Sequence, residues 1–94
     1  MIKFTENTII NDDIEFEKGG VVRCEEGDFI VLDIYEDGTQ RLVNLEDGYI
    51  IVLNSMNRTF NDCIKHGILH REKDFEIKSG YYAPKYVNVE VKLG

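Results

Sequence analysis

Three residues in the second half of the chain have the types and spacing of metal ligands. Cys63, His66 and His70 follow one another within one short segment, and thiolate and imidazole groups are common zinc ligands. A closed zinc site needs a fourth ligand, and no second pair of Cys or His residues supplies one. We therefore expect no metal and no cofactor, and interpret the segment as solvated histidines beside a core cysteine.

Hydrolytic chemistry would have to draw on the serines, the two histidines and the carboxylates. Ser55 and Ser79 are possible nucleophiles, but a nucleophile needs a base within hydrogen-bond reach and no spacing selects one. The chain also has no glycine-rich phosphate loop, no Gly-x-Ser-x-Gly elbow and no His-Glu-x-x-His helix. We expect no catalytic residues and a protein that is not an enzyme.

Tyrosines and basic side chains gather in residues 78–86, which we interpret as a loop too polar for the core. A tyrosine ring can stack on a nucleobase, and a lysine or arginine can bind a phosphate. One hypothesis is therefore a nucleotide-binding site, and its candidate residues are Arg71, Tyr81, Tyr82 and Lys85. The alternative is that the tyrosines cap an open end of the fold, with their rings buried and their hydroxyls in water.

Carboxylates are concentrated in the first half of the chain. Residues 1–50 hold 13 acidic and 4 basic residues, residues 51–94 hold 5 and 7, and the formal net charge is -7. Because nucleic-acid binding depends on Lys and Arg displacing counterions, generic DNA or RNA binding is disfavoured and a basic protein surface is favoured. The candidate contacts are the acids of the predicted turns, Asp28, Glu36, Asp37, Glu46 and Asp47. The alternative is that this charge only keeps a small protein soluble.

These acids lie on glycine-bearing turns that divide the chain into short apolar runs. The turns are Glu26-Gly27-Asp28, Glu36-Asp37-Gly38 and Glu46-Asp47-Gly48, and Asp-Gly suits a tight hairpin whose glycine has a positive φ. The runs between them predict antiparallel strands at residues 20–25, 29–35, 39–45 and 49–53. The second of these strands is apolar on both faces, which indicates a curled sheet.

The sequence predicts that two further segments extend this sheet and that a third forms a helix. Residues 14–17 would begin the sheet, and the alternating residues 86–93 would close it. Residues 59–67 have apolar residues at helical spacing, with Thr59 as the N-cap and Gly67 in the left-handed position after the helix. An isolated helix this short is marginal in water, so Phe60 must pack on the sheet.

Short antiparallel strands with one helix resemble the small SH3-like barrels. The run Gly-Thr-Gln-Arg-Leu-Val-Asn-Leu-Glu-Asp-Gly at residues 38–48 resembles hairpins in small uncharacterised phage and prophage proteins. The resemblance carries over no site residue. It implies that the protein acts by binding, as do those phage proteins that inhibit bacterial defence systems in the manner of anti-CRISPR proteins.

The sequence thus predicts a single mainly β domain over residues 1–94, a small curved antiparallel sheet or SH3-like barrel with one short helix near residues 59–66. Cys24 and Cys63 are expected to be free, buried thiols. No apolar run approaches the roughly 20 residues of a membrane-spanning helix, and the chain does not open on a signal-type stretch. We expect a cytoplasmic protein, and the resemblance implies a bacterial host.

Our leading hypothesis is a non-catalytic binding protein encoded by a phage or another mobile element. Its acidic surface would bind, and inhibit or adapt, a larger host or phage protein with a basic surface. We expect a monomer or homodimer that binds no membrane and shows no generic nucleic-acid binding. A nucleotide-sequestering protein is the alternative, and a phage structural or assembly subunit that pairs through residues 86–93 is a further one.

Overall fold

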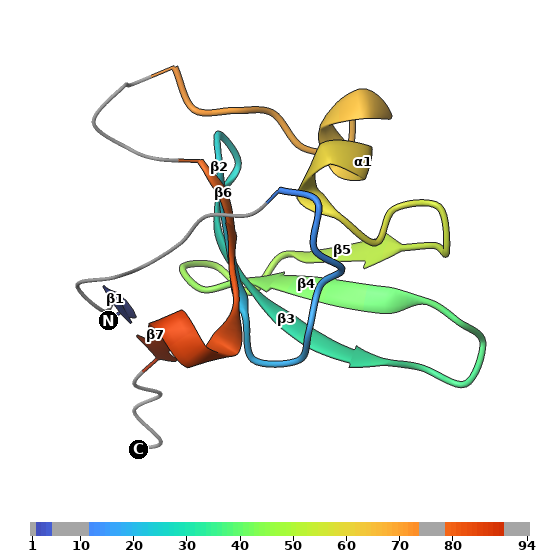
Figure 1. Ribbon diagram of the computed structural model, residues 1–94, viewed down its shortest axis with the longest axis horizontal. Coiled ribbons are helices and arrows are strands. Elements are labelled where there is room, and N and C mark those ends of the chain that lie inside the picture. The colour runs from blue at the N-terminus through green and yellow to red at the C-terminus, as the bar shows by residue number, and fades with distance from the viewer. Residues whose placement is uncertain (1, 5–11, 74–78, 90–94) are drawn as a thin grey trace.

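A computed structural model describes residues 2–4, 12–73 and 79–89 of the chain (Figure 1). In chain order, its strands and helices are β1 (Ile2–Phe4), β2 (Val21–Cys24), β3 (Gly27–Ile34), β4 (Gln40–Asn44), β5 (Ile50–Leu53), α1 (Phe60–Lys65), β6 (Gly80–Tyr82), the 3-10 helix η1 (Pro84–Tyr86) and β7 (Val87–Val89). None of the helices in this described part of the chain is long and apolar enough to span a membrane.

Five strands form one antiparallel sheet in the order β5-β4-β3-β2-β6. The four central strands predicted from the turns, β2 to β5, are confirmed with small differences at their ends. Gly38 and Gly48 have φ values of 81° and 77°, the left-handed conformation that an Asp-Gly hairpin turn requires. The sheet remains open, with β5 and β6 at its edges. The prediction of a mainly β fold with a small antiparallel sheet and one helix is therefore confirmed, but the sheet does not close into a barrel.

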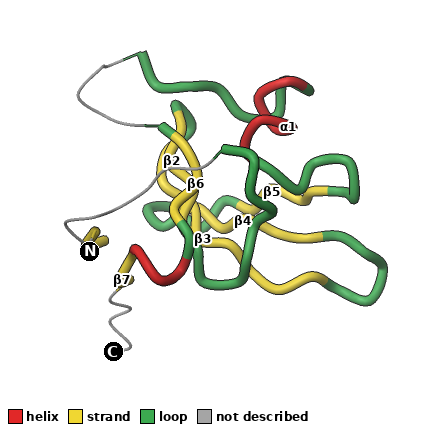
Figure 2. Tube along the Cα trace, viewed as in Figure 1, coloured by secondary structure: helices red, strands yellow, loops and turns green. Residues whose placement is uncertain are grey.

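The two predicted extensions of the sheet are wrong. Residues 14–17 form no strand but belong to a connection of turns and coil, drawn as loop in Figure 2, in which the Phe16 N–H donates to the carbonyl of Arg58. Residues 87–89 form β7, which pairs with β1 in a separate two-stranded sheet. The place beside β2 is already taken by β6, through the pairs Val21↔Tyr82 and Val22↔Tyr81, so residues 86–93 cannot close the sheet there. The end of that predicted strand lies outside the described residues.

The helix forms as its end signals predict. The Thr59 hydroxyl accepts a hydrogen bond from the N–H of Asp62 at 3.1 Å. At the other end Gly67 has a φ of 71°, and the N–H groups of Gly67 and Ile68 donate to the carbonyls of Ile64 and Cys63. These two bonds form a Schellman motif, which satisfies carbonyls that the last turn would otherwise leave unpaired.

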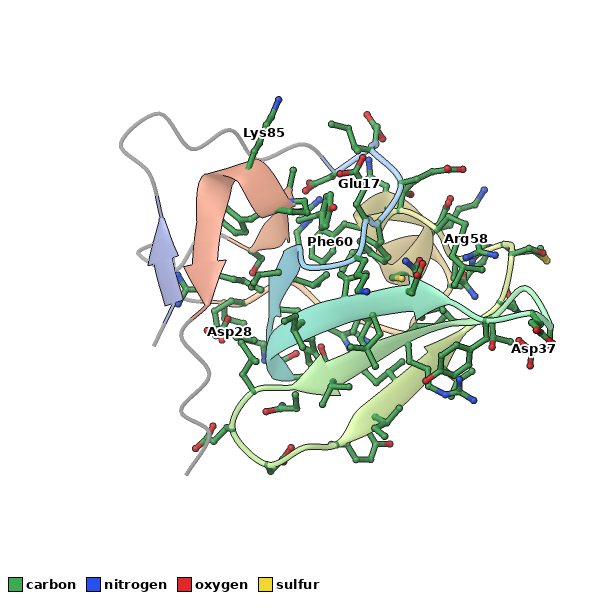
Figure 3. All side chains as sticks on the ribbon, turned by 90° about the horizontal axis from the view of Figure 1, so that it is seen from below. Glu17, Asp28, Asp37, Arg58, Phe60 and Lys85 are labelled. Carbon is green, nitrogen blue, oxygen red and sulfur yellow. The ribbon has the colours of Figure 1, made fainter. Side chains whose placement is uncertain are left out.

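One face of the sheet is covered by α1 and by residues 12–20. Figure 3 shows Phe60 between α1 and the sheet, and Phe60 is fully buried, as predicted. The core that results joins the inward side chains of the strands to those of the covering segments: Val22, Phe29, Val31, Leu42, Leu53, Phe16, Phe60, Cys63, Leu69 and Tyr81. We call this covered side the inner face of the sheet.

Candidate functional site

The β2–β3 and β4–β5 turns lie together at one end of the sheet. The N–H of Leu45 donates to the carbonyl of Asp28 at 2.9 Å, and Phe29 pairs with Asn44 across β3 and β4. Both turns are rich in acids, so the fold gathers carboxylates that the sequence separates by about twenty positions. We call this group the acidic end; its residues are Glu25, Glu26, Asp28, Glu46 and Asp47.

A buried amide holds the two acidic turns in place. Asn44 is only 7% exposed, and its Nδ2 donates to the carbonyl of Glu26 at 3.2 Å. Its Oδ1 accepts from the N–H groups of Glu46 at 2.8 Å and Asp47 at 3.3 Å. A Cβ on Gly27 would lie 2.9 Å from this Nδ2, so a glycine is needed at position 27 for the backbone to lie this close to the Asn44 side chain. Asn44 was not among the predicted site residues, although a lone amide at the end of an apolar strand and directly before a turn is a usable signal.

The charges of the acidic end are only partly neutralised. Arg23 forms an ion pair with Asp28, with Nε and Oδ1 3.0 Å apart. Glu26 accepts from both the backbone N–H of His70 at 2.9 Å and the ring Nδ1 of His70 at 2.8 Å. Asp47 accepts from a neutral donor, the backbone N–H of Tyr49. Among the described residues the structure shows no cationic partner for Glu46 or Asp47, so these two carboxylates project their charge into solvent.

The contact with His70 shifts the protonation of both partners. Partial burial alone would raise the pKa of Glu26, but the hydrogen bonds from the His70 ring and backbone hold it below its usual range. The same side-chain hydrogen bond, with the nearby negative charge of Glu26, raises the pKa of His70. The pair therefore favours imidazolium and carboxylate together.

The predicted acidic contacts do not form one cluster. Asp28, Glu46 and Asp47 belong to the acidic end, whereas Glu36 and Asp37 lie in the β3–β4 turn at the other end of the sheet; Figure 3 shows Asp28 and Asp37 far apart. There the Thr39 side chain and N–H donate to Asp37 at 2.6 and 3.0 Å. The hydroxyl bond in particular lowers the pKa of Asp37. Acidic groups thus stand at both ends of strands β3 and β4.

The prediction that residues 78–86 form a loop too polar for the core is wrong for its central part. Gly80–Tyr82 is strand β6, and the residues Tyr81 and Tyr82 are only 1% and 5% exposed. The two tyrosines are buried because β6 pairs with β2. Successive side chains of a strand point to opposite faces of the sheet, so Tyr81 packs on one face and Tyr82 on the other. Arg71 forms an ion pair with Asp12, while Lys85 is exposed on η1. Burial leaves neither ring face open for stacking on a base.

The structure does not bring Cys63, His66 and His70 together as metal ligands among the described residues. Cys63 is in the core, the Nδ1 of His66 lies 2.6 Å from the Oδ1 of Asn57, and His70 contacts Glu26. Glu25, Glu26 and His70 do place ligand-type atoms within 4.8 Å of one another, a group that was not predicted because its members are far apart in the sequence. All three side chains are exposed, and the hydrogen bonds between Glu26 and His70 already account for their approach.

Neither cysteine is suited to nucleophilic chemistry. Both are free and buried, and burial raises the pKa of each thiol to about 12. The reactive form of cysteine is the thiolate, which is therefore scarce at neutral pH. The hydroxyl of Ser79, one of the two possible serine nucleophiles, accepts a structural hydrogen bond from the N–H of Glu72 at 2.7 Å.

We compared the chain with protein-family models, curated proteins and solved structures. The chain matches no protein-family model, no curated protein and no solved structure.

Proposed function

We propose that the protein is a non-catalytic binding protein whose acidic end contacts a basic surface of a larger protein. The observation that carries this proposal is the position of Asn44, whose buried amide orders both acidic turns at once. Carboxylates held in a fixed arrangement lose less conformational entropy on binding than flexible ones. Opposite charges on the two partners would also speed their encounter and make it sensitive to salt.

The groups that catalysis would need support the same proposal. The thiols are buried and protonated, and both histidines have structural partners, Asn57 and Glu26. A binding role uses the negative charge of Glu46 and Asp47, for which no cationic partner is found in the part of the chain that the structure describes.

A bacterial host protein is the partner that we infer for a phage-encoded chain of this kind. The inference rests on residues 38–48 alone, the run that resembles phage and prophage hairpins. In the fold this run forms β4 with parts of both flanking turns, so it holds Asn44 and two acids of the acidic end. Binding there would inhibit or adapt the partner without any chemistry.

Affinity purification with matched charge variants tests the proposal. The tagged wild type, E46Q/D47N and the control E15Q/E17Q are each used to capture proteins from a bacterial lysate at low and high salt. Both double variants remove two negative charges, and the amide oxygen introduced at Asp47 can still accept from Tyr49. The control pair lies in the covering segment 12–20, away from the acidic end.

We expect a protein that the wild type and E15Q/E17Q retain at low salt, that high salt releases, and that E46Q/D47N retains much less. A captured protein that all three forms hold equally at both salt concentrations would contradict the proposal, because the acidic end would then contribute nothing. Circular dichroism of each variant verifies that the fold is unchanged.

A further inference from the structure

The face of the sheet opposite α1, which we call the outer face, is apolar where a solvated face would be polar. Ile30, Val43 and Ile50 stand side by side in register across β3, β4 and β5. Next to them Val52 pairs with Arg41. Ile50 and Val52 are 51% and 53% exposed. The covering segments, α1 and residues 12–20, pack on the inner face. On the outer face Ile30 and Val43 are partly buried, and the exposed apolar surface is therefore greatest at β5.

Strand β5 has the composition of a strand buried on both faces. Its sequence is Ile-Ile-Val-Leu; Leu53 is buried in the core and Ile51 packs against it, while Ile50 and Val52 point the other way. A strand of an antiparallel sheet with one solvated face normally alternates apolar with polar residues. Exposed, contiguous apolar surface of this kind marks interaction sites. β5 is also an edge strand of the sheet, so no further strand of the sheet lies beside the exposed side chains of β5.

The acidic residues around the outer face indicate which kind of partner could bind there. Glu36 and Asp37 stand at one end of β4, and Glu46 and Asp47 stand at the other. A second copy of this chain carries the same net charge of -7 and the same acids at both ends, so packing two outer faces together would bring like charges close. An anionic lipid surface would be repelled for the same reason. A partner with basic groups on both sides of an apolar centre has complementary charge.

We propose that the outer face binds a segment of the partner protein that has an apolar centre and basic residues at both ends. This inference rests on the proposed function and names the contact that the acidic groups would flank. The five residues of β4 extend over about 16 Å at roughly 3.3 Å per residue. An extended segment with about five central residues therefore covers the length of β4, and Lys or Arg on either side of it would extend towards the acids in the turns beyond the two ends of the strand.

A labelled peptide gives a direct test. The probe is Lys-Lys-Val-Thr-Val-Thr-Val-Lys-Lys with a fluorophore, and its binding to the full chain is followed by fluorescence anisotropy. A second peptide has Ser in place of each Val and so keeps the charge without the apolar centre. The protein variants are I50T/V52T on the outer face and the control I14T, an exposed isoleucine of the segment that covers the opposite face. Thr keeps the β-branched shape that strands favour, and a thermal melt verifies folding.

We expect the first peptide to bind I50T/V52T about tenfold more weakly than wild type, a loss of the size expected when two apolar side chains no longer become buried. Binding to I14T should stay within about twofold. In two-dimensional amide NMR spectra, the peptide should shift resonances of β4 and β5 more than those of α1.

The possible failures separate this inference from the proposed function. Equal affinity of the Val and Ser peptides, or equal affinity of wild type and I50T/V52T, would overturn the outer-face inference while leaving acidic-end binding intact. No binding of either peptide at low salt would overturn the inference, whatever the lysate capture shows. Sedimentation that finds a wild-type dimer dissociated by I50T/V52T would make a second copy the occupant and also overturn it.

Discussion

Replacing Tyr81 by Ala tests whether the tyrosine segment is structural or a binding surface. Tyr81 is the largest fully buried side chain of the described residues. Its ring lies 5.1 Å from that of Phe16, and its hydroxyl accepts from the backbone N–H of Glu17 at 2.8 Å. A Cβ on Gly20 would approach the ring to 2.6 Å, so the backbone is closely packed on it. Through these contacts Tyr81 joins β6 to the covering segment.

Tyr81→Ala lowers the free energy of unfolding in two ways, by removing the buried ring and by removing the hydrogen bond of the hydroxyl. Truncating a buried aromatic residue to Ala typically costs about 3–5 kcal/mol in free energy of unfolding, and losing one neutral hydrogen bond costs about 1 kcal/mol. Proteins of this size are stable by about 5–15 kcal/mol. We therefore expect Tyr81→Ala to remove a large share of the stability and Tyr81→Phe to remove about 1 kcal/mol.

Urea denaturation followed by circular dichroism measures both changes. With a slope of about 1–3 kcal/mol per molar urea, Tyr81→Ala should lower the midpoint by roughly 2 M or leave the protein unfolded in buffer. Tyr81→Phe should fold with a slightly lower midpoint. If Tyr81→Ala unfolds at the wild-type midpoint, the ring is not part of the core, and a role of the tyrosines in ligand binding would have to be considered again.

Three further predictions concern local contacts. Because the pKa of His70 is raised and that of Glu26 is lowered, the stabilisation from His70 is complete below its unfolded pKa of about 6.5 and is lost as pH rises through the raised value. That from Glu26 is complete above about pH 4.5 and is lost as pH falls through the lowered value. His70→Gln should thus reduce the urea midpoint most near pH 5–6 and least above pH 8; a difference independent of pH would contradict the ion pair. Gly67→Ala should cost about 1 kcal/mol by urea denaturation, because φ is positive there and a Cβ meets no neighbour; an unchanged midpoint would remove the helix-end argument. Cys24 and Cys63 should react slowly with a thiol reagent at pH 8 and quickly in denaturant, and rapid labelling of the native protein would contradict their burial.

Features determined by neighbouring residues could be predicted from the sequence. Gly38 and Gly48 follow Asp in hairpin turns, and Thr59 and Gly67 flank the helix; each acts through its own backbone within a few positions. The steric cost of a positive φ and the unpaired N–H groups of a first helical turn exist in any fold. These signals gave four strands and one helix at nearly the observed boundaries.

Features that join distant residues could not be predicted in the same way. Polar composition around Tyr81 indicated a loop, but composition does not say that β2 has an unpaired edge on which residues 80–82 can add a strand. The contact between Glu26 and His70 joins residues 44 positions apart, and nothing near either residue indicates it. Asn44 is an intermediate case, because its local turn contacts were predictable and its bond to Glu26 was not.

The outer face shows why one observation in the sequence allowed two outcomes. Apolar residues on both faces of the second predicted strand indicated a curled sheet with both faces partly covered. The sheet is open instead, so Phe29 and Val31 are in the core while Ile34 remains at the surface. Under the outer-face proposal, a segment of the partner covers the apolar side chains that the open sheet leaves exposed. Acids at the turns on either side favour a basic partner over a second copy of the chain, and on this reasoning the same hairpins provide both the fold and the binding surface.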